Sequence, residues 1–249
     1  MLGWKIFVHS VRMVFGNATT TLKIFILPVL GSLCLAIFFG EFSGTPAREG
    51  YDQVGADTGA FIARGVLWAV GTVVFMAWGV VSWHRFILLE EYPKGIVPKF
   101  SMSSIGAYIW RSIVLGFLIA VIVVPLAVIA GLFTSELFFS AFLVSAAISL
   151  LANFLTLRLG LMLPAAALES PMALRDAWSV TGKLTNAILI LVLCQLAVET
   201  ATETISILLP AGQLLYLIWE IVSFLLVALL NVSILTTMYG VFIEKRGLD

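Results

Sequence analysis

Three glutamates lie within the two long apolar segments nearest the C-terminus: Glu199, Glu203 and Glu220. A spacing of four residues places Glu199 and Glu203 on one face of a helix. A charged side chain in the middle of a membrane helix costs about 2.5–3.5 kcal/mol on insertion scales. Carboxylates held near one another also favour a shared proton or a bound cation. The three glutamates therefore form a candidate proton or cation site.

Smaller polar residues continue both glutamate-bearing faces, and neither segment contains a Lys or Arg. A hairpin about residues 210–212 predicts Glu203 level with Glu220, in the outer part of the membrane. Arg64 is the nearest cation by expected depth. The alternative is that residues 199–206 lie in the headgroup region or in water, where their carboxylates are ordinary solvated groups. The smaller polar residues are Gln195, Thr202, Ser206, Ser223 and Asn231.

A second polar set stands where other apolar segments end. His84 and Arg85 follow the second long apolar run, and Arg158 follows the fourth. One hypothesis is that these three residues contact the phosphate of a lipid headgroup. The alternative is that His84 is an interfacial histidine and the two arginines extend toward water from a membrane boundary.

The sequence lacks the motifs of several common catalytic sites. Neither a hydrolase triad signature nor a zinc-protease or phosphate-loop motif accompanies His84. Cys34 and Cys194 stand singly in apolar runs, without the spacing of metal ligands. We therefore expect no enzyme activity, no cofactor and no metal. The formal net charge of zero gives no indication of a nucleic-acid partner.

Long apolar segments must position these residues. Of the 249 residues, 61% are hydrophobic and 11% are charged, against about 25% charged in soluble domains. Crossing the hydrocarbon layer takes about 20 helical residues, and lipid leaves no other partner for backbone groups. The composition predicts an all-α integral membrane protein, with residues 1–249 as a single transmembrane domain. Six spans are predicted, at about 22–39, 61–83, 112–133, 137–157, 187–209 and 214–243.

The cations predict the orientation of these spans. Twelve Lys and Arg fall on one predicted side and two on the other, a strong positive-inside pattern. Both termini should then be cytoplasmic, and the first span should be an uncleaved helix. The twelve are Lys5, Arg12, Lys23, Arg85, Lys94, Lys99, Arg111, Arg158, Arg175, Lys183, Lys245 and Arg246, and the two are Arg48 and Arg64.

The cytoplasmic segments resemble one another. Three of them contain a short amphipathic stretch before the next span, near residues 4–15, 103–109 and 171–182. In the first, an apolar face that includes Trp4 and Phe15 predicts a helix lying in the lipid boundary. The exits at 85–93, 158–171 and 239–247 are also similar. One interpretation is a unit of interfacial helix plus helical hairpin repeated three times; the other is that these short similarities carry no repeat.

Short motifs in and beside these segments carry a family resemblance. They are Trp83-His84-Arg85 with Leu88-Leu89-Glu90, Leu163-Pro164-Ala165 after Arg158, and Ala177-Trp178 before Thr181-Gly182. The chain resembles a broad family of uncharacterised six-helix bacterial inner-membrane proteins. That family is similar to the membrane domain fused to some glycerophosphodiester phosphodiesterases. The resemblance implies a multi-pass protein of the bacterial inner (plasma) membrane and almost no chemistry.

Two functions are consistent with these observations. The first is a non-enzymatic structural or regulatory membrane protein that organises lipids or a partner. The alternative is a small proton- or cation-coupled transporter or channel that uses the carboxylates of the last two spans. The expected partners are membrane lipids, and beyond them a membrane-protein partner or a second copy of the chain.

Overall fold

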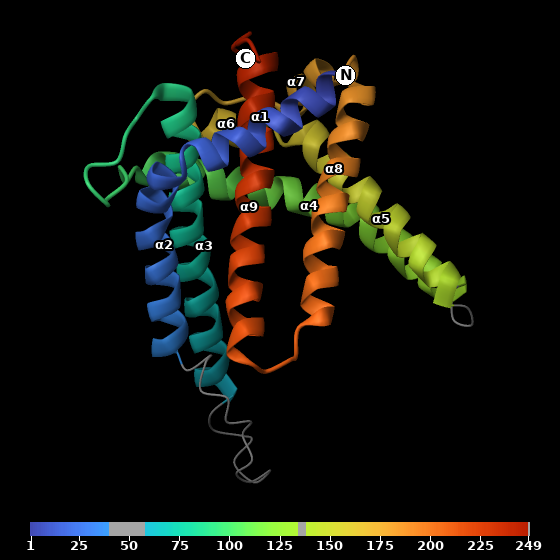
Figure 1. The fold of residues 1–249 in the computed structure, drawn as a ribbon, viewed down its shortest axis with the longest axis horizontal. Coiled ribbons are helices and arrows are strands. Elements are labelled where there is room, and N and C mark those ends of the chain that lie inside the picture. The colour runs from blue at the N-terminus through green and yellow to red at the C-terminus, as the bar shows by residue number, and fades with distance from the viewer. Residues whose placement is uncertain (40–57, 134–137, 249) are drawn as a thin grey trace.

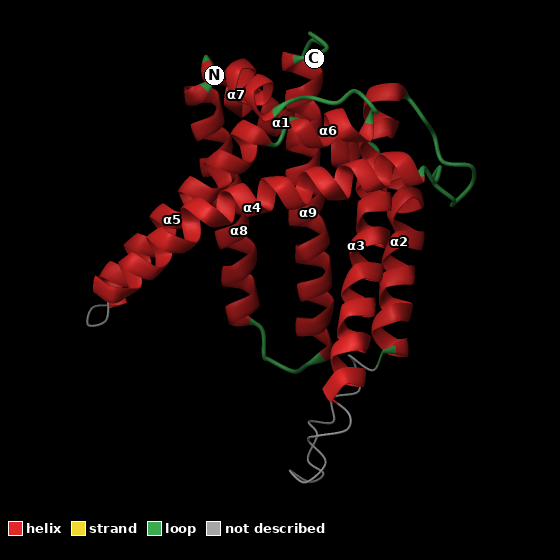
Figure 2. Ribbon diagram, turned by 180° about the vertical axis from the view of Figure 1, so that it is seen from behind, coloured by secondary structure: helices red, strands yellow, loops and turns green. Residues whose placement is uncertain are grey.

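The computed structural model describes residues 1–39, 58–133 and 138–248. In this part of the chain, helices joined by loops make up the fold (Figures 1 and 2). The helices are α1 (Leu2–Gly16), α2 (Ala18–Phe38), α3 (Thr58–Leu89), α4 (Met102–Phe133), α5 (Phe138–Leu159), α6 (Met162–Ala167), α7 (Leu174–Gly182), α8 (Thr185–Leu208) and α9 (Leu214–Phe242). The β pairing within it is a single bridge between Lys94 and Val97.

Five of these helices are long and apolar enough to cross a membrane: α2, α3, α4, α8 and α9. The prediction of an all-helical, multi-pass membrane protein is therefore confirmed. The fourth predicted span corresponds to α5, whose apolar stretch Leu143–Leu159 is shorter. A sixth span is not confirmed.

Two pairs of consecutive helices, α2 with α3 and α4 with α5, pack side by side. Helices α2 and α3 pack closely at Gly31. A Cβ there would lie 2.5 Å from the ring of Phe75, so this position needs a small residue. Helices α4 and α5 lie side by side and slant away from α2, α3, α8 and α9 (Figures 1 and 2). Most of the apolar surface of α4 is exposed, including Ile113, Phe117 and Val121. Such a surface suits lipid contact.

Three helices cover one end of the bundle. Helices α1, α6 and α7 lie at the end that holds both termini (Figure 1). The largest buried cluster lies here and includes Ile6, Leu161, Met162, Ile188 and Ile234. This layer is part of the protein core, since side chains from α1, α8 and α9 meet within it.

Helix α1 packs on the bundle through a face that the sequence analysis did not single out. Its buried face consists of Gly3, Ile6, Ser10 and Val14, whereas Trp4 and Phe15 are exposed. A Cβ at Gly3 would collide with the Ala187 carbonyl oxygen of α8. The structure docks α1 on α8 and α9 through this buried face, because Gly and Ser allow closer backbone contact than larger side chains. The contact of Trp4 and Phe15 with lipid stays a prediction.

The second amphipathic stretch differs from expectation. The stretch 103–109 is continuous with α4 from Met102 and does not form a separate interfacial helix. The exit after the second span is likewise helical as far as Leu89. The third stretch forms α7, with Ala177 and Thr181 buried. The exit run extends its membrane helix because no Gly or Pro lies between residues 83 and 89, and α4 continues as a helix through Gly106.

Candidate functional site

The polar faces of α8 and α9 line an open cavity of about 440 Å³. It lies in the half of the hairpin nearer its connecting loop, away from the termini (Figure 1). All three predicted glutamates line it, so the structure brings Glu199, Glu203 and Glu220 to one space. Glu199 and Glu220 are half-buried and Glu203 is exposed. The other lining residues are Thr202, Ser206, Ser223, Phe224, Val227, Ala228 and Asn231.

Glu220 is tied to α8 by hydrogen bonds. The Ser206 hydroxyl donates to Glu220 Oε1 at 2.6 Å. The indole of Trp219 donates to Ser206 Oγ at 3.1 Å and to the Thr202 carbonyl at 3.2 Å. Glu220 therefore lies level with Ser206, about one helical turn from the predicted level of Glu203. The shift arises from the loop at 209–213, whose length does not reveal how the two helices align.

An amide pair forms the deep end of the cavity. Gln195 Nε2 donates to Asn231 Oδ1 at 2.8 Å, and Gln195 is buried. Asn231 lies about 25 Å along α9 from the first residue of that helix. Beyond the pair, the fully buried Leu191, Val192 and Ile234 fill the space between the helices. The polar region thus ends at an apolar plug on the side of the termini.

Among the described residues, no Lys or Arg lines the cavity. Arg64 is exposed and forms no ion pair with any residue that the structure describes. Across residues 1–39, 58–133 and 138–248, no group of three His, Cys, Asp or Glu could hold a metal ion. The arrangement therefore suits protons, or a cation that keeps some of its water, better than a metal held directly by several carboxylates.

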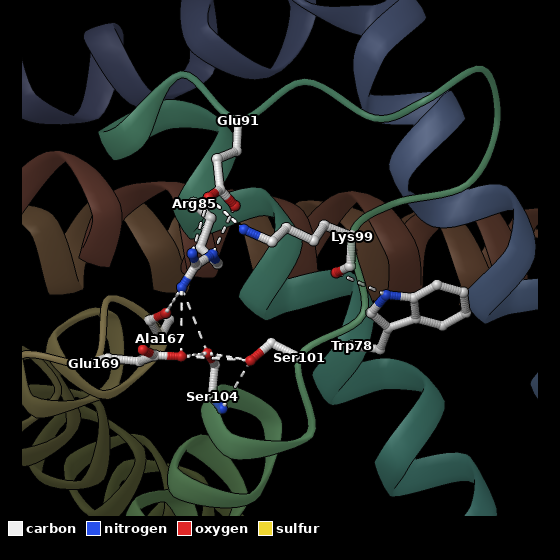
Figure 3. A network of polar contacts seen from close by, with 8 residues as sticks. All are labelled: Trp78, Arg85, Glu91, Lys99, Ser101, Ser104, Ala167 and Glu169. Atoms are coloured by element: carbon white, nitrogen blue, oxygen red, sulfur yellow. Dashed lines mark hydrogen bonds and ion pairs between the residues drawn. The ribbon is translucent and has the colours of Figure 1, made fainter.

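Arg85 is the centre of a different network (Figure 3), in the last two turns of α3. Its Nε and Nη2 donate to the two carboxylate oxygens of Glu91 at 2.8 and 2.9 Å. Lys99 Nζ donates to the same carboxylate at 3.0 Å. The bidentate hydrogen bond from Arg85 lowers the pKa of Glu91 to about 2. Glu91 is therefore ionised at every physiological pH.

The same guanidinium reaches α4 and α6. Arg85 Nη1 donates to the Ala167 carbonyl at 3.1 Å and lies 3.9 Å from Glu169 Oε1. The Ser104 hydroxyl donates to Glu169 at 2.7 Å, and this bond, together with the charge of Arg85, lowers the pKa of Glu169. Protein atoms surround Arg85, so a lipid phosphate would have to compete with Glu91 for it. Lipid contact at Arg85 stays a prediction.

Arg158 is buried without a carboxylate partner among the described residues. Its guanidinium carbon lies 3.9 Å from the centroid of the Trp178 ring and 5.7 Å from that of Phe154. Its Nη2 donates to the Trp178 carbonyl at 3.3 Å, and its Nη1 to Thr185 Oγ1 at 3.4 Å. The aromatic faces stabilise the cation, while its charge is not neutralised.

His84 forms a third, separate contact. Its Nδ1 lies 2.8 Å from Thr236 Oγ1, in the fully buried interior. The Thr236 hydroxyl already donates to the Val232 carbonyl at 2.8 Å, so we assign the proton to His84 Nδ1, which donates to Thr236. The structure thus places His84, Arg85 and Arg158 in three networks and does not assemble them into one headgroup site. The predicted contact of His84 with lipid is also untested.

Two arginines of the exit segments bind carbonyl oxygens at the ends of other helices. Arg85 bonds Ala167 of α6 and Arg246 bonds Leu88 of α3, whereas Arg158 bonds Trp178 in the middle of α7. A cation near a helix C-terminus is favourable, since the unpaired carbonyls there carry partial negative charge. Sequence reasoning missed these caps because each joins residues far apart in the chain.

The three exits also share a backbone feature. Glu90, Glu169 and Lys245 have positive φ angles of 55°, 57° and 60°. The residue after each donates its N–H to a carbonyl five or six residues back, as in helix ends closed by a left-handed residue. This common geometry favours the interpretation of a threefold pattern.

Comparison of the chain with protein-family models, with curated proteins and with solved structures finds no match. The resemblance to six-helix inner-membrane proteins therefore stays a prediction that rests on the short motifs.

Proposed function

We propose that the protein binds protons or small hydrated cations in the cavity between α8 and α9, as a small transporter or channel. The observation that carries this proposal is the meeting of Glu199, Glu203 and Glu220 on one cavity that no Lys or Arg of the described part of the chain lines. Intramembrane carboxylates gathered on a polar cavity are typical of ion and proton pathways.

The limits of the cavity suggest one state of an alternating mechanism. The polar lining extends from the loop end of the hairpin to the Gln195–Asn231 hydrogen bond. The apolar plug beyond this bond would prevent continuous passage. Passage would require α8 and α9 to separate at their other end, where α1 packs across both helices.

Flux through vesicles tests the proposal. Purified protein is reconstituted into vesicles. Proton flux, driven by an imposed proton gradient, is followed with a pH-sensitive dye inside, and Na⁺ or K⁺ flux, driven by a gradient of that ion, with a dye sensitive to it. Glu199→Gln and Glu220→Gln each remove a carboxylate of nearly the same size, and we expect at least a tenfold loss of flux. The matched control is Glu90→Gln, an exposed carboxylate at the opposite end. Equal flux in all variants, or flux no greater than in protein-free vesicles, would contradict the proposal.

A structural or regulatory role is the second candidate, without catalysis. It is favoured by the packed layer of α1, α6 and α7, on which Lys5 and Arg12 of α1 are exposed. Such a cationic face suits anionic headgroups or an acidic partner. Crosslinking in native membranes followed by mass spectrometry would identify a membrane-protein partner or a second copy of the chain.

We also propose six spans, with both termini cytoplasmic, in the plasma membrane of a bacterium. The distribution of Lys and Arg supports the orientation. The bacterial source rests on the family resemblance alone.

A further inference from the structure

A second cavity, of about 500 Å³, lies where α7 leads into α8 beside the start of α1. These three elements come together at the end of the bundle that holds the termini (Figure 1). Lys183, Thr185 and Asn186 supply its polar lining, and Leu2 and Ile190 supply apolar walls. None of its described lining residues is acidic. The cavity is therefore suited to an anion with an apolar part.

The first turn of α8 contributes unpaired donors to this space. The N-cap residue, Leu184, makes no side-chain cap, and the first helical bond runs from the Ile188 N–H to the Leu184 carbonyl. The N–H groups of residues 185–187 therefore have no partner within the helix. Thr185, Asn186 and Ala187 all line the cavity. Helix N-termini of this kind bind phosphate, because their N–H groups and the helix dipole favour negative charge.

Arg158 adds an independent observation behind the same wall. Its side chain is more than nine-tenths buried, and its Nε has no hydrogen-bond partner. Its Nη1 donates to Oγ1 of Thr185, a residue that lines the cavity, and this hydroxyl in turn lies 3.2 Å from the Gly182 carbonyl, to which it donates. Carbonyl oxygen and aromatic faces are its only other described partners. A buried cation without a counter-ion is costly, and an anion at Thr185 would compensate it.

We infer that this cavity binds a phosphate group, held by Lys183, Thr185 and the first N–H groups of α8, with Arg158 behind. The group could belong to an anionic phospholipid or to a free phosphate compound. A lipid fits the surroundings, since Leu189 and Leu193 continue an exposed apolar path along α8 from the cavity. The site is about 20 Å from Glu199 along α8, so it is independent of the proposed transport cavity.

Binding by purified protein in a non-ionic detergent tests this inference. The probes are phosphatidylglycerol, phosphatidylcholine and inorganic phosphate, with bound lipid counted by native mass spectrometry and phosphate binding measured by calorimetry. The double variant Lys183→Gln with Thr185→Ala removes two ligands; Lys183 is exposed and Thr185 half-buried, so folding should be retained. The matched control is Lys94→Gln, an exposed lysine of the 90–101 segment.

We expect phosphatidylglycerol to bind in preference to phosphatidylcholine, and the double variant to weaken its binding about tenfold or more. Lys94→Gln should bind as the unaltered protein does. Binding of inorganic phosphate, lost in the same variant, would assign the site to a free phosphate compound. If neither probe binds, or if the double variant and Lys94→Gln bind phosphatidylglycerol equally, the inference is overturned.

Discussion

Glu91 is the side chain whose charge depends most clearly on its contacts. Its two oxygens accept hydrogen bonds from Arg85, and one also accepts a bond from Lys99. Arg85 is largely shielded from solvent, with a side-chain exposure of 12%. Removing the Glu91 charge would leave that guanidinium without its closest counter-ion.

We predict that Glu91→Gln lowers the free energy of unfolding by about 1–3 kcal/mol at neutral pH. The pKa of Glu91 is lowered from 4.5 to about 2, so the stabilisation is fully present above about pH 4.5. It is lost as the pH falls through about 2, because protonation removes the charge in the native state. Thermal unfolding in detergent between pH 2 and 7 measures both effects.

The control for this prediction is Glu90→Gln. Glu90 is exposed, adjacent in sequence and outside the ion-pair network, so its loss should cost less than about 0.5 kcal/mol. A Glu91→Gln variant as stable as Glu90→Gln at pH 7 would show that the network contributes nothing.

Helix α1 shows how one small residue positions an element. Gly3 lies against the Ala187 carbonyl, and Ile6 and Ser10 continue the contact toward α9. The Ser10 hydroxyl lies 2.9 Å from Thr237 Oγ1, which fixes the depth of the helix. The docking of α1 therefore depends on a backbone approach that any Cβ at residue 3 would prevent.

We predict that Gly3→Ala loosens α1 even though Ala favours a helix over Gly by about 1 kcal/mol. Faster hydrogen exchange of the α1 amides would measure the loosening. Gly16→Ala is the comparison, since a Cβ there would meet nothing within 4 Å, and exchange should be unchanged or slower. Equal exchange in the two variants would show that α1 docking does not depend on the Gly3 contact.

The helices could be predicted from sequence because their signals are local. Apolar runs located the five long helices, and the spacing of Glu199 and Glu203 placed both on the cavity face. The level of Glu220 could not be predicted, because it depends on how the loop at 209–213 orients two helices. The pairing of Arg85 with Glu91 was likewise missed, since it requires the left-handed residue Glu90 between them.

At the scale of the whole molecule, polar groups divide between two ends. The termini and the ion pairs of Arg85, Lys99 and Arg246 lie at one end (Figure 1). The acidic cavity lies in the opposite half of α8 and α9. Such a division suits a chain whose cation-rich end faces the cytoplasm.

We predict that both termini face one compartment and the loop at 209–213 the other. Single cysteines replace Lys5, Gly212 or Gly247 after Cys34 and Cys194 are changed to Ala, and intact cells are treated with a membrane-impermeant thiol reagent. Only Gly212→Cys should be labelled before the cells are opened. Labelling of Lys5→Cys or Gly247→Cys in intact cells would reverse or refute the orientation.

The caps formed by Arg85 and Arg246 have a consequence for biosynthesis. Arg246 Nη2 and the Leu88 oxygen that it binds are 158 residues apart in sequence. At ordinary translation rates, about 10–30 s separate the synthesis of these two residues. The carbonyls at the end of α3 therefore remain without this cap until α9 has been inserted. Ribosome-bound chains that stop before α9 should have a frayed end of α3. The last helix to enter the membrane thus completes the hairpin of α2 and α3.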